Sequence, residues 1–153
     1  MGSALVAVRT GLITALATLT DTGESLDGVH VSYAYPRGPE KRETIYTVGG
    51  KFNHSSASMR ATKTFRNEVG TFDVRVLVRG ISLAQETTSA RAIALGVIVE
   101  DFVATHANWS NSALGVAIQT MTVDGDGELV EAFNDKGTLA ELSIPVRYTA
   151  RLT

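Results

Sequence analysis

The last part of the chain carries the sequence feature that most constrains the fold, a long and strict alternation of apolar and polar positions. Its apolar or small members are Ala140, Leu142, Ile144, Val146, Tyr148, Ala150 and Leu152. Because successive side chains of a β-strand point to opposite faces of a sheet, a period of two predicts one long strand with a single buried face. Pro145 has no N–H to donate, so it predicts a bulge or an edge position in that strand.

Two other stretches have the spacing of helices. Apolar residues recur every three or four positions over 5–19, and Ser3 has the side chain of an N-cap. A second helix is predicted from about Gln85 to His106, with Ser82 and Gln85 at the spacing of a capping box. Its predicted core positions are Ala90, Ile93, Ala94, Val97, Ile98 and Phe102. The almost wholly apolar middle predicts that this helix is the central core element.

The remaining strand patterns come in runs separated by turn residues. Strands are predicted over 29–35, 44–48, 59–65, 72–78, 115–123 and 129–133, and turns over 67–70, 124–127 and 134–137. This order predicts an α+β fold, a mostly antiparallel β-sheet packed by an N-terminal helix and a long central helix. The 153 residues fit one domain, over 1–153, because a second domain would be too small to bury its own core.

Two polar segments are predicted as loops. The first, 36–42, contains two prolines and a glycine, and the second, 49–58, begins with two glycines and is rich in serine and asparagine. In the strand predicted after them, the polar side chains of Arg60, Thr62 and Thr64 alternate, and Arg66 continues the pattern. We expect that face to meet water or a partner instead of the core.

The residue types that carry catalysis or bind metals do not form a recognisable pattern. The chain has no cysteine, which excludes disulfides, thiol catalysis and cysteine-ligated zinc. His30, His54 and His106 lack a neighbouring ligand at metal-binding spacing. The acidic run at 124–128 lacks the glycine and the distal glutamate of a calcium loop, so it predicts a hairpin turn. We expect no catalytic residue, metal or cofactor, and no enzymatic activity.

The charges are unevenly distributed although the net charge is only −2. Residues 37–91 carry ten basic and five acidic side chains, whereas residues 92–153 carry three basic and eight acidic ones. Such charges can pair within one monomer, or they can join copies head to tail as complementary patches. A third possibility is nucleic-acid binding by Arg60, Lys63, Arg66, Arg75 and Arg79, although few aromatic residues lie near them.

Neither a membrane anchor nor a signal peptide is expected. The apolar runs are shorter than the roughly 18–20 residues that span a bilayer. Arg9 interrupts the first apolar block, and no basic residue precedes it, so the N-terminal stretch is predicted to be a soluble amphipathic helix.

Several segments together resemble the tail-terminator (tail-completion) proteins of long-tailed, siphovirus-like bacteriophages. They are ALVAVRTGLITALATL, VHVSYAYPRGPEKRETIYTVGG, TFDVRVLVRG with TTSARAIALGVIVEDFVATH, and TLAELSIPVRYTARL. The resemblance implies an α+β fold and a homohexameric ring that caps the tail tube and docks to the head-completion proteins. It implies a virion protein of the tail–neck junction, made in the host cytoplasm, with DNA only as cargo passing through the lumen.

The resemblance gives the two predicted loops a role as contacts to neighbouring subunits or to the next ring. A second hypothesis places the polar strand face after the loops at a subunit contact. The candidate contact residues are Arg37, Lys41, Arg42, Lys51, Phe52, Asn53 and His54 of the loops, and Arg60 and Arg66 of that face. Two alternatives stay open: a head-to-tail connector subunit of similar size and fold, and a small partner-binding α+β module that works as a dimer.

Overall fold

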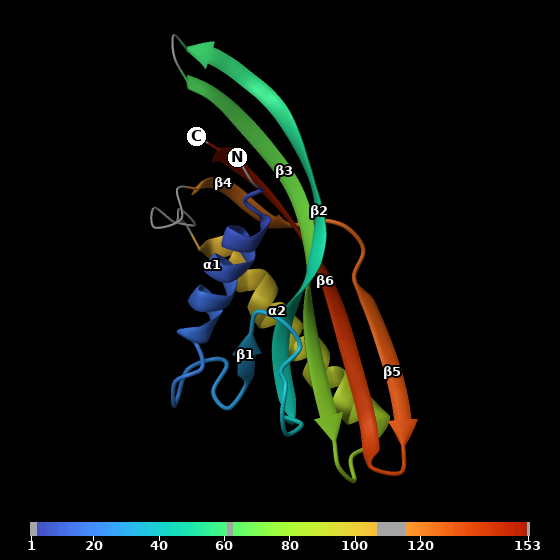
Figure 1. The fold of residues 1–153 in the computed structure, drawn as a ribbon. Coiled ribbons are helices and arrows are strands. Elements are labelled where there is room, and N and C mark those ends of the chain that lie inside the picture. Colours follow the sequence, from blue (N-terminus) through green and yellow to red (C-terminus); the bar gives the residue numbers. More distant parts are fainter. Residues whose placement is uncertain (1–2, 61–62, 107–115, 153) are drawn as a thin grey trace.

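A computed structural model describes residues 3–60, 63–106 and 116–152. Within these ranges, the side chains of 56–60, 63–65 and 116–117 are not described. The helices are α1 (Leu5–Ala17) and α2 (Gln85–Thr105). The strands are β1 (His30–Ser32), β2 (Glu43–Arg60), β3 (Lys63–Gly80), β4 (Val116–Val123), β5 (Glu128–Asn134) and β6 (Gly137–Leu152). Figure 1 shows both helices on one face of a curled sheet. The α+β class and the mostly antiparallel sheet are therefore confirmed.

The strands form one sheet in the order β1-β2-β3-β6-β4, and β5 pairs with β6 on the same side as β4. β4 pairs with the C-terminal half of β6 and β5 with its N-terminal half. All pairings are antiparallel except that of β1 with β2, which is parallel. One edge of the sheet is thus formed by β1 and β2, and the opposite edge by β4 and β5.

The long alternation is β6, as predicted. Its even-numbered residues from 144 to 152 are buried, and they pack with Leu12 and Leu16 of α1 and Leu95 and Val99 of α2 in one apolar core. Burial of such apolar area is the main favourable term in folding.

Pro145 lies inside the sheet, so the predicted edge position is wrong. Its carbonyl accepts a hydrogen bond from Asp124 N, 3.1 Å away, and β6 is paired with β3 on its other side. In a strand the N–H and C=O of one residue point to the same side, so the nitrogen of Pro145 faces the segment that links β4 and β5. The missing N–H falls where the β4 ladder ends and the β5 ladder begins.

The two N-terminal segments behave largely as expected. Ser3 Oγ accepts a hydrogen bond from Leu5 N at the start of α1, 3.0 Å away, which is the role of a cap. The strand predicted over 29–35 is shorter, only His30–Ser32, and the loop over 36–42 is confirmed.

The core face predicted for α2 is wrong in part: Ile98 and Phe102 pack partly buried against the core, but the other four predicted positions are exposed. The buried residues are Thr88, Ser89, Ala92, Leu95, Gly96, Val99 and Val103. Ile93 and Val97, assigned to the core from spacing, are 44% and 47% exposed. Gly96 explains the choice of face, because a Cβ there would collide with the Leu142 side chain, so the helix packs closely on β6 where it has no side chain.

The predicted capping box is also wrong. The residue before α2 is Ala84, which makes no side-chain cap, and Ser82 has a φ of 57°. Gln85 Nε2 instead donates to Ser89 Oγ and to the Leu139 carbonyl, at 3.1 and 3.2 Å. The start of α2 is therefore fixed by contacts to itself and to β6.

The largest correction concerns 44–78, where the predicted short strands, the loop over 49–58 and the turn over 67–70 merge into two long strands. β2 and β3 form one hairpin whose residues are paired from Glu43 with Val78 to Arg60 with Lys63. Gly49 and Gly50 are not a strand end but a β-bulge in β2. A Cβ at Gly50 would overlap the Thr71 carbonyl, so this position requires glycine. The strand predicted over 59–65 is the end of β2 and the start of β3, and 61–62 lie outside the described residues.

The C-terminal elements agree in part with the sequence. The strands predicted over 115–123 and 129–133 are β4 and β5, although Gly115 lies outside the described residues. The turn over 134–137 contains Gly137 with a φ of 128°, which favours glycine. The hairpin turn predicted for the acidic segment is wrong, although Gly125 has a φ of 120°. β4 and β5 both run antiparallel to β6, one after the other along the same side, so this segment links two strands of the same direction.

Candidate assembly surfaces

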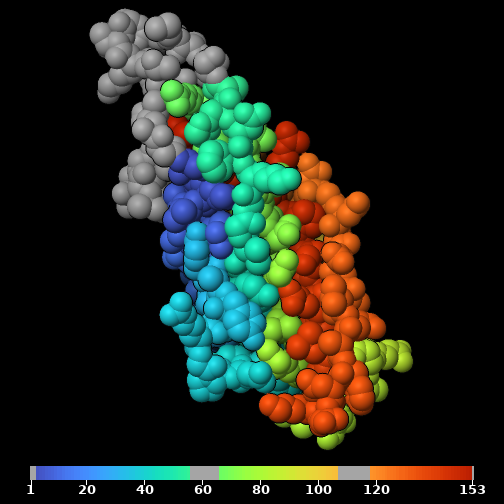
Figure 2. All heavy atoms as spheres, turned by 45° about the vertical axis from the view of Figure 1, so that its right-hand side comes forward, coloured from blue at the N-terminus to red at the C-terminus, as the bar shows by residue number. Residues whose placement is uncertain are grey.

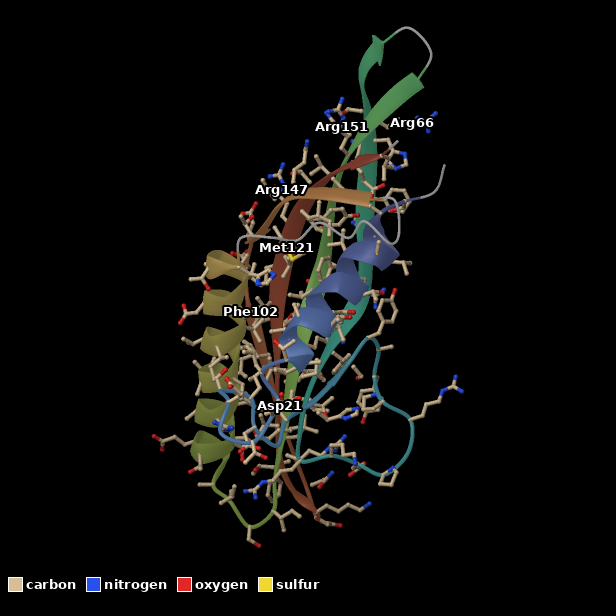
Figure 3. The ribbon with its side chains drawn as sticks, turned by 90° about the vertical axis from the view of Figure 1, so that its left-hand side faces the viewer. Asp21, Arg66, Phe102, Met121, Arg147 and Arg151 are labelled. Atoms are coloured by element: carbon tan, nitrogen blue, oxygen red, sulfur yellow. The ribbon has the colours of Figure 1, made fainter. Side chains whose placement is uncertain are left out.

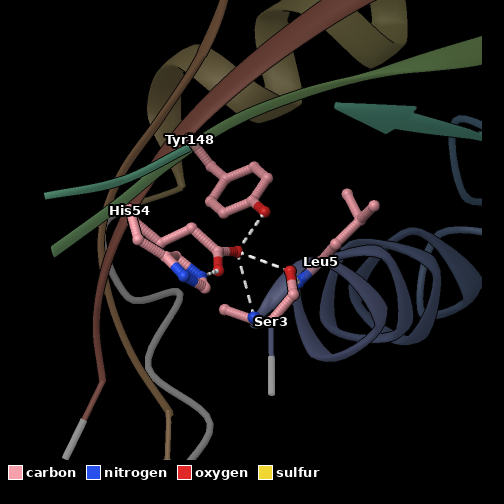
Figure 4. Close-up of polar contacts among 6 residues, drawn as sticks. Ser3, Leu5, His54 and Tyr148 are labelled. Atoms are coloured by element: carbon pink, nitrogen blue, oxygen red, sulfur yellow. Dashed lines mark hydrogen bonds and ion pairs between the residues drawn. The ribbon is translucent and has the colours of Figure 1, made fainter. Parts of the chain in front are cut away.

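The described residues hold a buried polar cluster around Glu68 of β3, whose side chain is fully buried. Its Oε1 accepts hydrogen bonds from Tyr148 Oη at 2.5 Å, Ser3 Oγ at 2.8 Å and Ala4 N at 3.0 Å. Its Oε2 lies 2.5 Å from His54 Nε2 (Figure 4). A buried carboxylate is costly unless it is hydrogen-bonded, and the positive end of a helix dipole at the α1 N-terminus also favours its charge.

This cluster joins three parts of the chain. His54 lies on β2 directly opposite Glu68, Tyr148 comes from β6, and Ser3 precedes α1. Burial, and then the hydrogen bond to Glu68 and its charge, raise the pKa of the Tyr148 phenol. Both carboxylate oxygens are occupied by donors of the fold itself. The arrangement therefore holds the root of the β2–β3 hairpin against α1 and β6, which is a structural task.

Sequence reasoning missed Glu68 because it placed this residue in a turn. The alternation of the sequence could have shown its position, because Glu68 is separated by an even number of residues from Phe72, Val74 and Val76, which all face the core. An acidic residue in register with a buried face indicates a buried polar contact.

Beyond this cluster the β2–β3 hairpin projects past the rest of the sheet. β6 pairs with β3 only as far as Arg66, which lies opposite Leu152. Among the described residues, no strand pairs with the outer side of β2 past Tyr46. We call residues 51–66 the arm; its first part, 51–55, lies beside residues 67–71 of β3, which still pair with β6, and only the part past these residues projects. Figure 1 shows its far part rising clear of both helices.

The arm is basic, and most of its described side chains are exposed. Residues 44–67 contain Lys51, Arg60, Lys63 and Arg66 and no acidic residue. Lys51, Phe52, Asn53 and Arg66 are exposed, with the Phe52 side chain 49% exposed. Figure 3 shows Arg66 and Arg151 near the place where the arm leaves the sheet. The Arg60 side chain lies outside the described ones.

The structure divides the candidate contact residues into two groups. Lys51, Phe52, Asn53, His54, Arg60 and Arg66 belong to the arm, whereas Arg37, Lys41 and Arg42 lie in the exposed loop at the opposite end of the sheet. His54 differs from the rest, because it is bound to Glu68. The candidate set therefore does not form one surface.

The loop at 36–42 borders a groove of about 890 Å³. Lys41, Arg42, Arg79 and Lys136 line this groove together with Glu40. Arg79 is already engaged, because it pairs with Glu40 at 3.5 Å and donates to Tyr35 Oη at 2.8 Å. The groove thus mixes basic and acidic side chains instead of presenting a purely basic pocket.

The opposite edge of the sheet is formed in part by β5, every residue of which is exposed. In the described part of the chain β5 pairs with β6 alone. Phe133 is 82% and Val130 49% exposed. Glu131 accepts a hydrogen bond from Ser89 Oγ of α2 at 2.7 Å, and Glu128 lies at the start of the strand. Figure 2 shows the C-terminal strands forming one flank of the molecule.

Ion pairs neutralise part of the charge division between the middle of the chain and its C-terminal part. Arg75 of the basic middle pairs with Glu141 of the acidic C-terminal part, at 3.2 Å. Burial and the Glu141 charge raise the pKa of the Tyr46 phenol, whose oxygen is 3.2 Å from Glu141. In contrast, the ion pair of Arg91 with Glu43 joins two residues of the basic middle region. The ion pair of Arg147 with Asp124 joins two residues of the acidic C-terminal part.

Comparison with known proteins gives no assignment, because no protein-family model and no curated protein matches the chain. Within residues 3–60, 63–106 and 116–152, no three histidine, aspartate or glutamate side chains are grouped as a metal site. The helices of the same residues are too short or too polar to cross a membrane.

Proposed function

We propose that this chain is a structural virion protein, a tail terminator that forms a homohexameric ring at the end of a bacteriophage tail tube. In this role it joins the tube to the head-completion proteins of the neck, and DNA passes through the ring only as cargo. It has no catalytic residue and needs no cofactor or membrane. In the fold that the resemblance implies, α2 is the long central helix.

One observation carries the proposal: the sheet has two different open edges, a basic arm on one side and the acidic, exposed β5 on the other. Two unlike surfaces on opposite edges suit a head-to-tail contact between copies. Such a contact closes into a ring when the rotation between copies divides a full turn. Exposed apolar side chains such as Phe133 also indicate a surface that another copy covers in an assembly.

The test is electron microscopy of the purified protein, alone and mixed with tail tubes. Six-fold rings, or caps at one end of the tubes, are the expected result. Twelve-fold rings would contradict the terminator assignment and favour a head-to-tail connector subunit. Particles of one or two chains that ignore the tubes would contradict the proposal and favour a partner-binding module.

A further inference from the structure

The outer edge of β5 is open to receive another strand. Its backbone groups on the side away from β6 have no strand partner in the described residues, and its side chains are exposed on both faces. An exposed edge strand with apolar side chains such as Val130 and Phe133 is a template for pairing with a strand of another chain.

Charge excludes the simplest partner, a second β5. Residues 124–136 carry five acidic side chains and a single lysine. Two β5 strands side by side would bring the acidic side chains of one copy against those of the other, which is destabilising. The partner strand must therefore be extended, basic and free on one edge.

The arm of this same chain meets these conditions. The edge of β2 past Tyr46 has no strand partner among the described residues, and residues 44–67 carry four basic side chains and no acidic one. Its root is held in place by the fully buried Glu68. A strand that is already fixed in its extended form loses little conformational entropy on binding.

We propose that the free edge of the β2 arm of one copy adds as a strand to β5 of the next copy. This inference rests on the proposed function, since an assembly of copies brings the two edges together. The contact is heterologous, so each copy uses its arm on one side and its β5 on the other.

The position of the two edges sets a further constraint on the assembly. The arm lies at one end of the sheet and β5 at the other (Figure 1). Neighbouring copies are therefore staggered along their strands. In a closed ring such a stagger inclines the strands to the ring axis, as it does in β-barrels.

The test uses cysteine cross-linking, in which only the introduced cysteines react because the chain has no cysteine of its own. Asn53→Cys marks the arm and Val130→Cys marks β5, and both side chains are substantially exposed. A bismaleimide cross-linker is added to concentrated protein. We expect a mixture of the two single variants to give a dimer, and each single variant alone to give none. The double variant should give a ladder of multiples of the monomer.

The matched control moves the second cysteine to the neighbouring edge strand. Gln119→Cys lies on β4, is exposed and shares the β5 side of the sheet. It should cross-link to Asn53→Cys at least several-fold less than Val130→Cys does. A dimer of Val130→Cys alone, a preference for Gln119→Cys, or no cross-link in any mixture would overturn the inference. Circular dichroism of each variant checks that it is folded.

Charge exchange provides a second, independent reading. Glu128→Lys in the β5-marked variant should lower the cross-linking yield several-fold, and Lys51→Glu in the arm-marked variant should do the same. Combining the two changes should restore the yield, because the attraction is re-formed with reversed sign. If the two changes together lower the cross-linking yield further instead of restoring it, the pairing of these two edges is contradicted.

The outcomes separate this inference from the proposed function. Six-fold caps on tubes without the Asn53–Val130 cross-link would leave the terminator function standing and overturn the contact. A cross-linked ladder from protein that forms no rings and ignores tubes would support the contact and contradict the terminator function.

Discussion

Glu68 and His54 face each other across the β2–β3 pairing, and their side chains meet with Glu68 Oε2 at 2.5 Å from His54 Nε2. The other oxygen of the same carboxylate binds Tyr148 and the residues that precede α1. One buried side chain therefore holds together the hairpin, the first helix and the last strand. The projecting part of the arm lies beyond this cluster, so its orientation depends on contacts made well below its tip.

Substitution of Glu68 should destabilise the fold strongly. Glu68→Gln keeps the shape but removes the charge, and its amide nitrogen cannot accept a hydrogen bond as the carboxylate oxygen that it replaces does. Loss of a charged partner for buried donors costs about 2–3 kcal/mol. We expect a decrease of that order in the free energy of unfolding, measured by urea denaturation.

Glu100→Gln is the matched control for this change. Glu100 lies on the exposed side of α2, where a substitution alters stability by about 0.5 kcal/mol or less. Equal effects of the two substitutions would show that the Glu68 cluster does not hold the fold together.

Alkaline pH should unfold the protein partly through Tyr148. Burial, followed by the hydrogen bond to Glu68 and its charge, raises the pKa of this phenol above its ordinary value of about 10. The folded state therefore favours the neutral phenol. This contribution to stability is fully present below pH of about 10 and is lost as the pH rises through the raised pKa.

The comparison is between the wild type and Tyr148→Phe, with urea denaturation at pH values from neutral to strongly alkaline. The wild type should lose stability more steeply above pH of about 10 than the variant. The variant keeps some slope, because burial and Glu141 also raise the pKa of Tyr46. Parallel curves for the two proteins would rule out a role of Tyr148 in the alkaline transition.

The buried face of α2 can be tested with two residues of the same type. Val99 is fully buried and Val97 is 47% exposed. Truncation of a buried valine removes apolar contacts and leaves a cavity, so Val99→Ala should cost about 2 kcal/mol. Val97→Ala should cost about 0.5 kcal/mol or less, as measured by thermal or urea denaturation. The reverse order would restore the helix face that was predicted from spacing.

Hydrophobic spacing could not choose the face of α2, because apolar residues surround most of this helix. Both the predicted set with Ile93 and Val97 and the observed set with Leu95 and Val99 have helical spacing. The close approach of Gly96 to Leu142 decides between them, and it depends on a residue 46 positions away along the chain. In contrast, the apolar residues of β6 occupy only every second position, so both the strand and its buried face were predictable.

The arm was not predictable as a strand for a different reason. Residues such as Lys51, Asn53 and Ser55 are exposed, so they have no apolar period that marks a strand. Pairing with β3 supplies the structure instead, and a pairing partner is not visible in local composition. The candidate contact residues stay a prediction, and their separation into the arm and the loop with Arg37, Lys41 and Arg42 is visible only in the fold.

The bulge in β2 gives a last prediction, because it contains two adjacent glycines in different surroundings. A Cβ at Gly50 would overlap the backbone carbonyl of Thr71, which cannot move without distorting β3. A Cβ at Gly49 would meet only Arg9 Nη1, at an ordinary contact distance of 3.9 Å. Gly50→Ala should therefore lower the free energy of unfolding by about 3 kcal/mol, whereas Gly49→Ala should change it by less than about 1 kcal/mol. Urea denaturation of both variants measures the difference. Similar stabilities would mean that the bulge can relax around a side chain, and that Gly50 is not what fixes the bend at the base of the arm.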